Sequence, residues 1–331
     1  MRAVRVHAFG PIEAARVETV DDPRPGPGEV AIRAAAIGVN FPDLLVIRGQ
    51  YQVKPPLPFS PGKELAGEIV AIGAGVAGLE PGDRVMAQVE YGAYAEIVIA
   101  PAAMTFRMPD EMSFEAGAAL GLTYQTAWFA LRAHADVQPG EIVLVPGAAG
   151  GVGLAAVELA KAMGAVVVAG VRHPEQSDLL RAHGADHVVD LSVADLRSAL
   201  RDQLRTATGG RLADVVIEPV GGEVFDASLR ALAWRGRLVV VGFASGRIPS
   251  AAANYLLVKN IFVSGMQWTD YRDRQPAAVR DAQQAMYGMW REGRLRPPIM
   301  APHPLDGFAD ALARIERGRL LGKVLLLPGG A

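Results

Sequence analysis

The segment from residue 142 to residue 163 constrains the fold more than any other part of the sequence. An apolar strand, Ile142 to Pro146, is followed by a glycine-rich turn and then by a helix, Leu154 to Met163. Small residues in such a turn let the backbone approach a phosphate, and the free amides of the helix N-terminus stabilise its charge. The segment therefore predicts a dinucleotide-binding unit, and the alternative is a purely structural turn. The predicted pyrophosphate contacts are Ala148, Ala149, Gly150, Gly151, Val152 and Gly153.

Five further apolar, β-branched runs follow this strand and alternate with helical segments. This alternation is typical of a parallel sheet covered by helices on both faces. The sequence therefore predicts an α/β fold with a doubly wound, six-stranded sheet of Rossmann type. The five runs are Val166 to Val171, His187 to Val189, Val215 to Ile217, Leu238 to Val241 and Ile261 to Val263.

The chain of 331 residues is long enough for two domains, because single hydrophobic cores rarely grow beyond about 250 to 300 residues. The first hundred residues contain short alternating segments separated by proline and glycine, which favours a β-rich domain. A helix from Pro276 to about Glu292 and a strand from Lys323 to Leu327 are predicted to return to it. The expected domains are 1–122 with 266–331, and 123–265.

Composition excludes several classes of protein. The chain has no cysteine, which rules out disulfides, thiolate metal sites and a catalytic thiol and favours a reducing, cytoplasmic environment. A net charge of -2 gives no field for polyanions, so neither nucleic acid nor a membrane is expected as a partner.

The end of the second predicted strand of this sheet bears on which cofactor is bound. An acidic residue at this position would hold the ribose 2′-hydroxyl of NAD, but here Val171 is followed by Arg172 and His173. A guanidinium can form charge-assisted bonds to a 2′-phosphate. The sequence therefore predicts NADPH, bound in part by Arg172 and His173, and the alternative is a solvated surface arginine.

Several motifs together resemble the zinc-independent quinone oxidoreductases of the medium-chain dehydrogenase/reductase superfamily, over nearly the whole chain. The resemblance implies a GroES-like catalytic domain joined to the Rossmann domain. It also implies a homodimer, which the apolar last strand of the sheet independently favours. The motifs are Gly38 to Asp43, Pro61 to Gly67, Pro81 to Val85, Gly147 to Gly153 and Gly322 to Val324.

The resemblance also implies site residues beyond the glycine-rich turn. Asn40 and Tyr51 match family positions beside the nicotinamide, and Thr126 matches a position that contacts the nicotinamide ribose or phosphate. A second family tyrosine is replaced by Leu45, and a tyrosine often found beside the cofactor is replaced by Leu191. Further cofactor contacts implied by the resemblance are Gly242, Phe243, Ala244 and Lys323. Gln267 and Trp268 follow the sixth predicted strand and are predicted to line the acceptor pocket.

Zinc enzymes of the same superfamily have a cysteine near Asn40 and a histidine at the position of Lys63. A lysine ammonium is no metal ligand, so we expect no metal. His183 and His187 are four residues apart, but Gly184 should end the helix between them, so they are interpreted as surface or packing residues.

Without a metal, hydrogen-bond donors must stabilise the negative charge that develops on a reduced acceptor. The predicted catalytic donors are Asn40, Tyr51 and Lys63; Tyr51 could instead pack on Pro55 and Pro56, and Lys63 could be a solvated lysine. The predicted activity is hydride transfer from NADPH to a quinone or a related electron-poor carbonyl compound. The alternatives are reduction of an activated double bond in an enone or enoyl thioester, and a non-catalytic, crystallin-like NADPH-binding protein.

Overall fold

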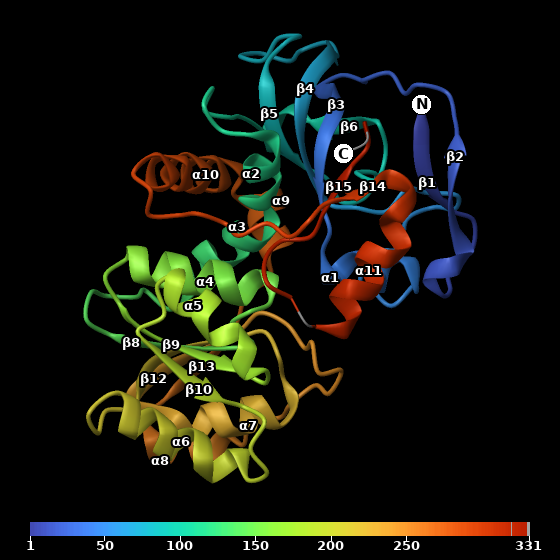
Figure 1. The fold of residues 1–331 in the computed structure, drawn as a ribbon. Coiled ribbons are helices and arrows are strands. Elements are labelled where there is room, and N and C mark those ends of the chain that lie inside the picture. The colour runs from blue at the N-terminus through green and yellow to red at the C-terminus, as the bar shows by residue number, and fades with distance from the viewer. Residues whose placement is uncertain (319, 330–331) are drawn as a thin grey trace. The chain divides into compact units, whose positions relative to one another are not determined.

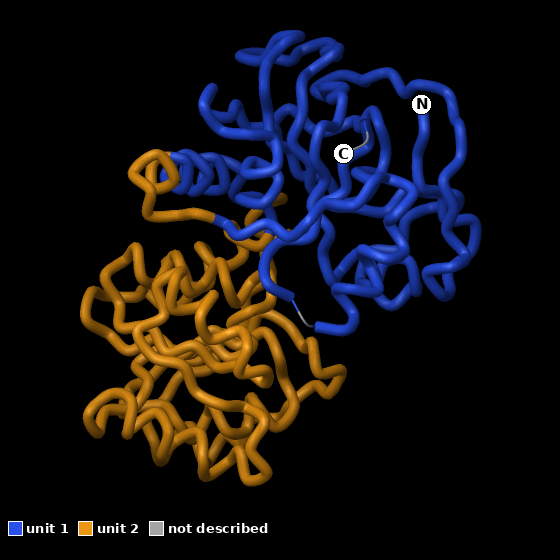
Figure 2. Tube along the Cα trace, in the orientation of Figure 1, with its two compact units in different colours: residues 1–122, 274–287, 297–331 blue, residues 123–273, 288–296 orange. Residues whose placement is uncertain are grey.

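The computed structural model describes residues 1–318 and 320–329, which form two compact units (Figure 2). Unit 1 contains 1–122, 274–287 and 297–331, and unit 2 contains 123–273 and 288–296. Unit 2 thus includes 266–273 and 288–296, which the sequence assigns to the first domain, and the division into domains stays a prediction. Residues 319, 330 and 331 of that predicted domain lie outside the described residues.

Unit 2 is built on a six-stranded parallel sheet with the strand order β10-β9-β8-β11-β12-β13. In chain order this is 3-2-1-4-5-6, the order of the dinucleotide-binding Rossmann fold, with the switch point between β8 and β11. The predicted sheet is confirmed. The strands are β8 (Ile142–Pro146), β9 (Val166–Val171), β10 (His187–Asp190), β11 (Ala213–Glu218), β12 (Leu232–Val240) and β13 (Phe262–Gly265).

Helices cover both faces of this sheet, with α4 and α5 on one side and α6 and α7 on the other (Figure 1). Every residue of β8 is buried, which explains its uninterrupted apolar sequence. The helices of this unit are most of α3 (Leu122–Phe129), α4 (Gly151–Ala162), α5 (Ser177–Ala182), α6 (Leu196–Ala207), α7 (Gly222–Ala231), α8 (Ala253–Lys259) and most of α9 (Trp268–Arg274).

Unit 1 is β-rich, as predicted. Its main sheet has the order β14-β15-β3-β4-β5-β7, with β6 paired to β3, and β1 and β2 form a separate antiparallel pair. The strands are β1 (Arg2–Val6), β2 (Ala15–Thr19), β3 (Glu29–Gly38), β4 (Glu64–Ile72), β5 (Arg84–Gln88), β6 (Ile97–Pro101), β7 (Thr105–Arg107), β14 (His303–Pro304) and β15 (Leu325–Leu327). Its helices are α1 (Phe41–Ile47), α2 (Phe114–Ala119), most of α10 (Pro276–Arg291) and α11 (Phe308–Arg317).

Candidate functional site

The glycine-rich turn after β8 is held tightly against its surroundings in unit 2. The Ala148 amide donates to the Gly170 carbonyl at 3.1 Å, and the Gly150 amide donates to the Gly147 carbonyl at 3.0 Å. A Cβ on Gly153 would overlap the Gly147 carbonyl oxygen, so only glycine lets the first turn of α4 pack this closely. The turn therefore places the start of α4 directly beyond the carboxyl end of β8.

The N-terminus of α4 has the free donors that an anion needs. Its N-cap residue Gly150 has no side chain to accept a bond. Among the described residues no acceptor contacts the amides of Gly151, Val152 or Gly153. The aligned peptide dipoles of this twelve-residue helix add partial positive charge at the same end. These features fit the pyrophosphate of a dinucleotide.

Arg172 and His173 follow β9, the strand beside β8. Gly170 of β9 pairs with Pro146 of β8 and also accepts the bond from Ala148, so the two strands end side by side. Arg172 is exposed and contacts no acid among the described residues, while His173 Nδ1 lies 3.8 Å from Glu175. The structure thus brings a guanidinium without an acidic partner to the strand end next to the glycine-rich turn.

Gly242, Phe243 and Ala244 follow the end of β12, at the same edge of the sheet as the glycine-rich turn. The Ala244 amide donates to the Pro219 carbonyl at 3.0 Å, and the Phe243 side chain is 42% exposed. Thr126 lies buried in α3, whose Thr123 side chain is next to Gly151 at the start of α4. The cofactor-binding residues predicted in unit 2 therefore lie around one sheet edge and the helix start beside it.

In unit 1, Asn40 is the centre of a buried polar cluster with Glu64 and Lys323. The Asn40 Nδ2 group donates to Glu64 Oε1 at 2.8 Å and to the Gly38 carbonyl at 3.3 Å, and its Oδ1 accepts from Lys323 Nζ at 2.7 Å. Lys323 Nζ also donates to Glu64 Oε1 at 2.5 Å. Both N–H groups of the Asn40 side chain are thus used, whereas the described residues bind only two of the three N–H groups of Lys323.

Glu64 holds this cluster together and was missed by the sequence reasoning, which used its motif only as a mark of the family. Its side chain is fully buried. Its Oε1 takes the bonds from Asn40 and Lys323, and its Oε2 accepts a bond from the Leu122 amide. One carboxylate therefore joins the start of β4 to the start of α1, to residue 122 and to the segment before β15.

Asp43 and Tyr94 extend the cluster and were also missed. The Asp43 Oδ2 atom accepts from the Asn40 amide at 2.8 Å and from the Tyr94 hydroxyl at 2.9 Å. Burial raises the pKa of Asp43 to about 6, against the opposing effects of these bonds and of the charges on Lys63 and Lys323. Burial also raises the pKa of Tyr94, next to Asp43, well above its usual value. Asp43 thus fixes the backbone of Asn40 at the start of α1.

Lys63 is not solvated, so that interpretation of the sequence is wrong. Its side chain is only 5% exposed, and its ammonium donates to the Glu90 carbonyl at 2.8 Å and to Glu90 Oε1 at 2.7 Å. The ammonium also lies 4.5 Å from the centroid of the partly buried Tyr51 ring. Lys63 and Tyr51 therefore form one contact pair, and Glu90 neutralises the lysine.

The remaining residues named from the sequence have contacts of their own. His183 follows α5 and contacts buried Glu158 at 2.6 Å, whereas His187 begins β10, so the two histidines share no helix face, as predicted. Trp268 is buried and donates to Gln125 Oε1 at 3.0 Å, while Gln267 is exposed and donates to Thr269. The role of Gln267 and Trp268 in the acceptor pocket stays a prediction.

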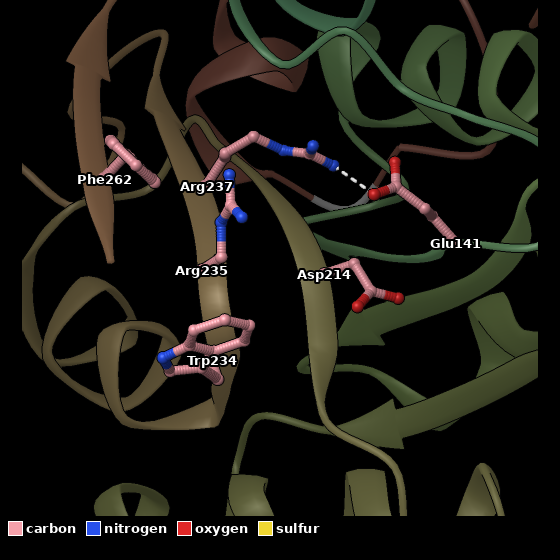
Figure 3. Close-up of a pocket in the computed structure, with 6 residues that line it drawn as sticks. All are labelled: Glu141, Asp214, Trp234, Arg235, Arg237 and Phe262. Atoms are coloured by element: carbon pink, nitrogen blue, oxygen red, sulfur yellow. Dashed lines mark hydrogen bonds and ion pairs between the residues drawn. The ribbon is translucent and has the colours of Figure 1, made fainter. Parts of the chain in front are cut away.

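A pocket of about 280 Å³ lies at the opposite, amino-terminal end of the parallel strands (Figure 3). Arg237 crosses it to pair with Glu141 at 2.5 Å, and the Trp234 side chain is 73% exposed. Because ligands of doubly wound sheets bind beyond the carboxyl ends of the strands, this pocket is separate from the predicted cofactor site. Its lining residues are Glu141, Asp214, Trp234, Arg235, Arg237 and Phe262.

The described residues contain no cluster of three potential metal-ligating acids or histidines. At the two positions where zinc relatives have ligands, Asn40 and Lys63 are bonded to carboxylates, and a protonated lysine cannot ligate a cation. These residues do not fit a zinc site. Within residues 1–318 and 320–329, no helix has the length and apolar character needed to cross a bilayer.

Comparison with known proteins identifies the family. Residues 26–110 match the alcohol dehydrogenase GroES-like domain and residues 151–284 match the zinc-binding dehydrogenase family. Mouse quinone oxidoreductase-like protein 2 is 39% identical over 306 residues, which cover 92% of this chain and 86% of the mouse protein.

Solved structures agree with this match. A mycobacterial protein complexed with NADPH aligns with a TM-score of 0.92 and 33% identity, over 99% of this chain and 100% of that one. Escherichia coli quinone oxidoreductase complexed with NADPH aligns with a TM-score of 0.91 and 29% identity, over 99% and 100% of the two chains.

The fold, the glycine-rich turn and these matches define an oxidoreductase of the medium-chain dehydrogenase/reductase superfamily. Within that superfamily, the chain belongs to the quinone oxidoreductase family. The predicted GroES-like fold of the β-rich domain and the predicted resemblance are both confirmed.

Proposed function

We propose that the protein is an NADPH-dependent reductase that transfers hydride to quinones or related electron-poor carbonyl compounds without a metal. The observation that carries the choice of cofactor is Arg172, an exposed guanidinium at the strand end beside the glycine-rich turn. Two structural neighbours at this fold are NADPH complexes, and one of them is a quinone oxidoreductase, which supports both halves of the proposal.

The cofactor would be held at several points by this chain. The free amides of residues 151–153 would bind the pyrophosphate, against which residues 148–150 would pack. Arg172 and His173 would bind the 2′-phosphate, and residues 242–244 would contact the carboxamide end. Thr126, Asn40 and Lys323 are the further proposed contacts. NADPH supplies the hydride, and the protein supplies position and electrostatics.

The roles proposed for the acceptor site follow from the hydrogen bonds of unit 1. Because Glu64 and the Gly38 carbonyl take both side-chain N–H groups of Asn40, Asn40 acts by fixing the Lys323 ammonium rather than by donating to the acceptor. The remaining Lys323 N–H serves the cofactor. Tyr51 is the proposed donor to the reduced acceptor, and Lys63 holds the Tyr51 ring in place.

A panel of acceptors tests the activity itself. NADPH oxidation is measured with ortho- and para-quinones, enones and acyl thioesters. We expect quinones to give the highest kcat/KM. Faster turnover of enones or thioesters would favour reduction of activated double bonds, and no turnover of any acceptor would leave a non-catalytic NADPH-binding protein.

The absence of cysteine is the reason that we place the reaction in the reducing cytoplasm.

Treatment with a chelator should leave the reductase activity unchanged. The positions of two zinc ligands in related enzymes hold Asn40 and Lys63, which have neither a thiolate nor an imidazole and are bonded to carboxylates. The measurement is the turnover number before and after dialysis against a strong chelator. Activity that falls on dialysis and returns with added zinc would show that the donor set has been misjudged.

The Tyr51→Phe variant should lower kcat while leaving the dissociation constant of NADPH unchanged. The substitution removes the hydroxyl but keeps the ring that lies over Lys63, so the local packing is retained. Turnover and NADPH binding are measured separately for both proteins. An unchanged kcat with every active acceptor would give Tyr51 a packing role.

We also propose a homodimer paired through β13. This strand is the last in the sheet, its Phe262 side chain is 57% exposed, and the neighbouring helix α8 buries none of its residues. Leu257 and Val258 of that helix are each 78% exposed. An apolar sheet edge of this kind favours pairing with a second copy.

Light scattering of the wild type should give the mass of a dimer, and the Phe262→Glu variant should give the mass of a monomer. A monomeric wild type at micromolar concentration would contradict the proposal.

A further inference from the structure

Glu218 is the last residue of β11, and within the part of the chain that the structure describes its buried carboxylate is bound only to backbone amides. Its Oε1 accepts from the Val220 amide at 2.9 Å and from the Gly221 amide at 3.0 Å, and its Oε2 accepts from the Gly221 amide at 2.9 Å. The side chain has no exposed surface. No lysine or arginine among the described residues pairs with it. An ionised carboxylate without a cation is costly to bury, and such groups cluster at functional sites.

The turn that Glu218 holds, residues 219–222, contacts the glycine-rich turn on one side. A Cβ on Gly147 would lie 2.8 Å from the Val220 side chain. β11 is also the neighbour of β8 at the switch point of the sheet, where the strand order reverses. The turn therefore lies at the crevice where dinucleotides bind in this fold.

The same turn contacts the loop after β12 on its other side. The carbonyls of Pro219 and Val220 accept bonds from the amides of Ala244 and Ser245, at 3.0 Å and 2.8 Å. Gly221 has φ +73°, which favours glycine, and a Cβ there would lie 2.8 Å from the Arg247 carbonyl. The turn is thus the direct link between the loop proposed to bind the pyrophosphate and the loop proposed to bind the carboxamide end of the cofactor.

We infer that Glu218 is a positioning residue for NADPH: its carboxylate fixes the 219–222 turn, and the turn sets the spacing between the glycine-rich turn and residues 242–244. This inference rests on the proposed function, because it takes those two segments as the cofactor site. It assigns no chemical step to Glu218, which contacts the site only through the backbone of the turn.

The matched variants are Glu218→Gln, Glu218→Asp and the exposed control Glu223→Gln on α7. Glutamine replaces one acceptor oxygen with a donor that faces the Gly221 amide. Aspartate keeps the charge and can still accept from an amide two residues on. Because charge-assisted bonds are lost, we expect the dissociation constant of NADPH to be at least about 10-fold higher for Glu218→Gln than for the wild type. Glu218→Asp should bind close to wild type, and Glu223→Gln should be unchanged.

The dependence of affinity on pH separates positioning from a general loss of folding. Burial raises the pKa of Glu218 to about 7. Protonation as the pH falls through this value removes the negative charge and turns one accepting oxygen into a donor, which should weaken cofactor binding. The other charged groups near the turn are Arg247, which pairs with Asp226 at 2.6 Å, and Glu223; segments 147–153 and 241–246 contain no ionisable side chain. NADH is the probe for this profile, because it has no 2′-phosphate to titrate.

Dissociation constants are measured by nicotinamide fluorescence, with circular dichroism as a check on folding. Wild type that binds no NADPH would overturn the proposed function and this inference with it. If the wild type binds NADPH and Glu218→Gln binds it equally well, the inference alone is overturned. If Glu218→Gln does not fold, the wild-type profile decides: tighter NADH binding above pH about 7 than below it supports the inference, and a flat profile overturns it.

Discussion

Replacing Glu64 with alanine should lower the free energy of unfolding by about 3 to 5 kcal/mol, the range for removing one partner of a buried ion pair. The Lys323 ammonium, whose side chain is 6% exposed, would lose its only acidic partner within the described residues. Asn40 and the Leu122 amide would lose an acceptor as well. The measurement is the midpoint of denaturant unfolding, followed by circular dichroism.

Two further variants show whether the buried charge causes the loss. Glu68→Ala changes an exposed acid on the same strand and should alter stability by no more than about 0.5 kcal/mol. The double variant Glu64→Leu with Lys323→Met replaces both charges by apolar groups and should recover much of the stability. A Glu64→Ala protein as stable as Glu68→Ala would contradict the account of this cluster.

The Arg172→Ala variant should lose most of its preference for NADPH over NADH. A hydrogen bond to a charged group corresponds to roughly a 10-fold to 150-fold change in affinity. Binding of NADH should hardly change, because NADH has no 2′-phosphate to lose. His173 lies beside Arg172, and any bond that it makes would place the measured loss toward the lower end of this range.

The ratio of kcat/KM for NADPH to that for NADH is compared in the wild type, Arg172→Ala and Arg205→Ala. Arg205 is an exposed arginine in the last turn of α6, and its removal should leave the ratio unchanged. A wild type that prefers NADH, or a ratio that does not move in Arg172→Ala, would make Arg172 a surface residue.

The sequence predicts most of the Rossmann unit because its determinants are local. Each strand is a short apolar run, and the turn Gly147 to Gly153 is recognised from neighbouring residues alone. The helix start predicted at Leu154 is three residues later than the observed start of α4 at Gly151. The glycines at 151 and 153 are poor helix formers, but the hydrogen-bonded turn before them places both in α4.

The polar cluster of unit 1 could not be predicted in the same way, because its contacts join distant parts of the chain. Lys323 meets Asn40 across 283 positions, and Lys63 meets Glu90 across 27. The periodicity of apolar residues along the sequence does not indicate such distant pairs. The charge on Lys63 favoured a solvated side chain, and only the contact with Glu90 explains its burial. Glu218 was missed for a related reason, since its partners are backbone amides that have no sequence signature.

Single-turnover oxidation of deuterated NADPH tests the central claim, hydride transfer from the nicotinamide, most directly. The enzyme is loaded with NADPH deuterated on one or the other face of the nicotinamide carbon that carries the hydride, and a quinone is then mixed in. The account predicts that one of the two cofactors is oxidised more slowly than unlabelled NADPH, because its carbon–deuterium bond breaks. NADPH that stays reduced with every quinone, or identical rates for all three cofactors, would contradict it.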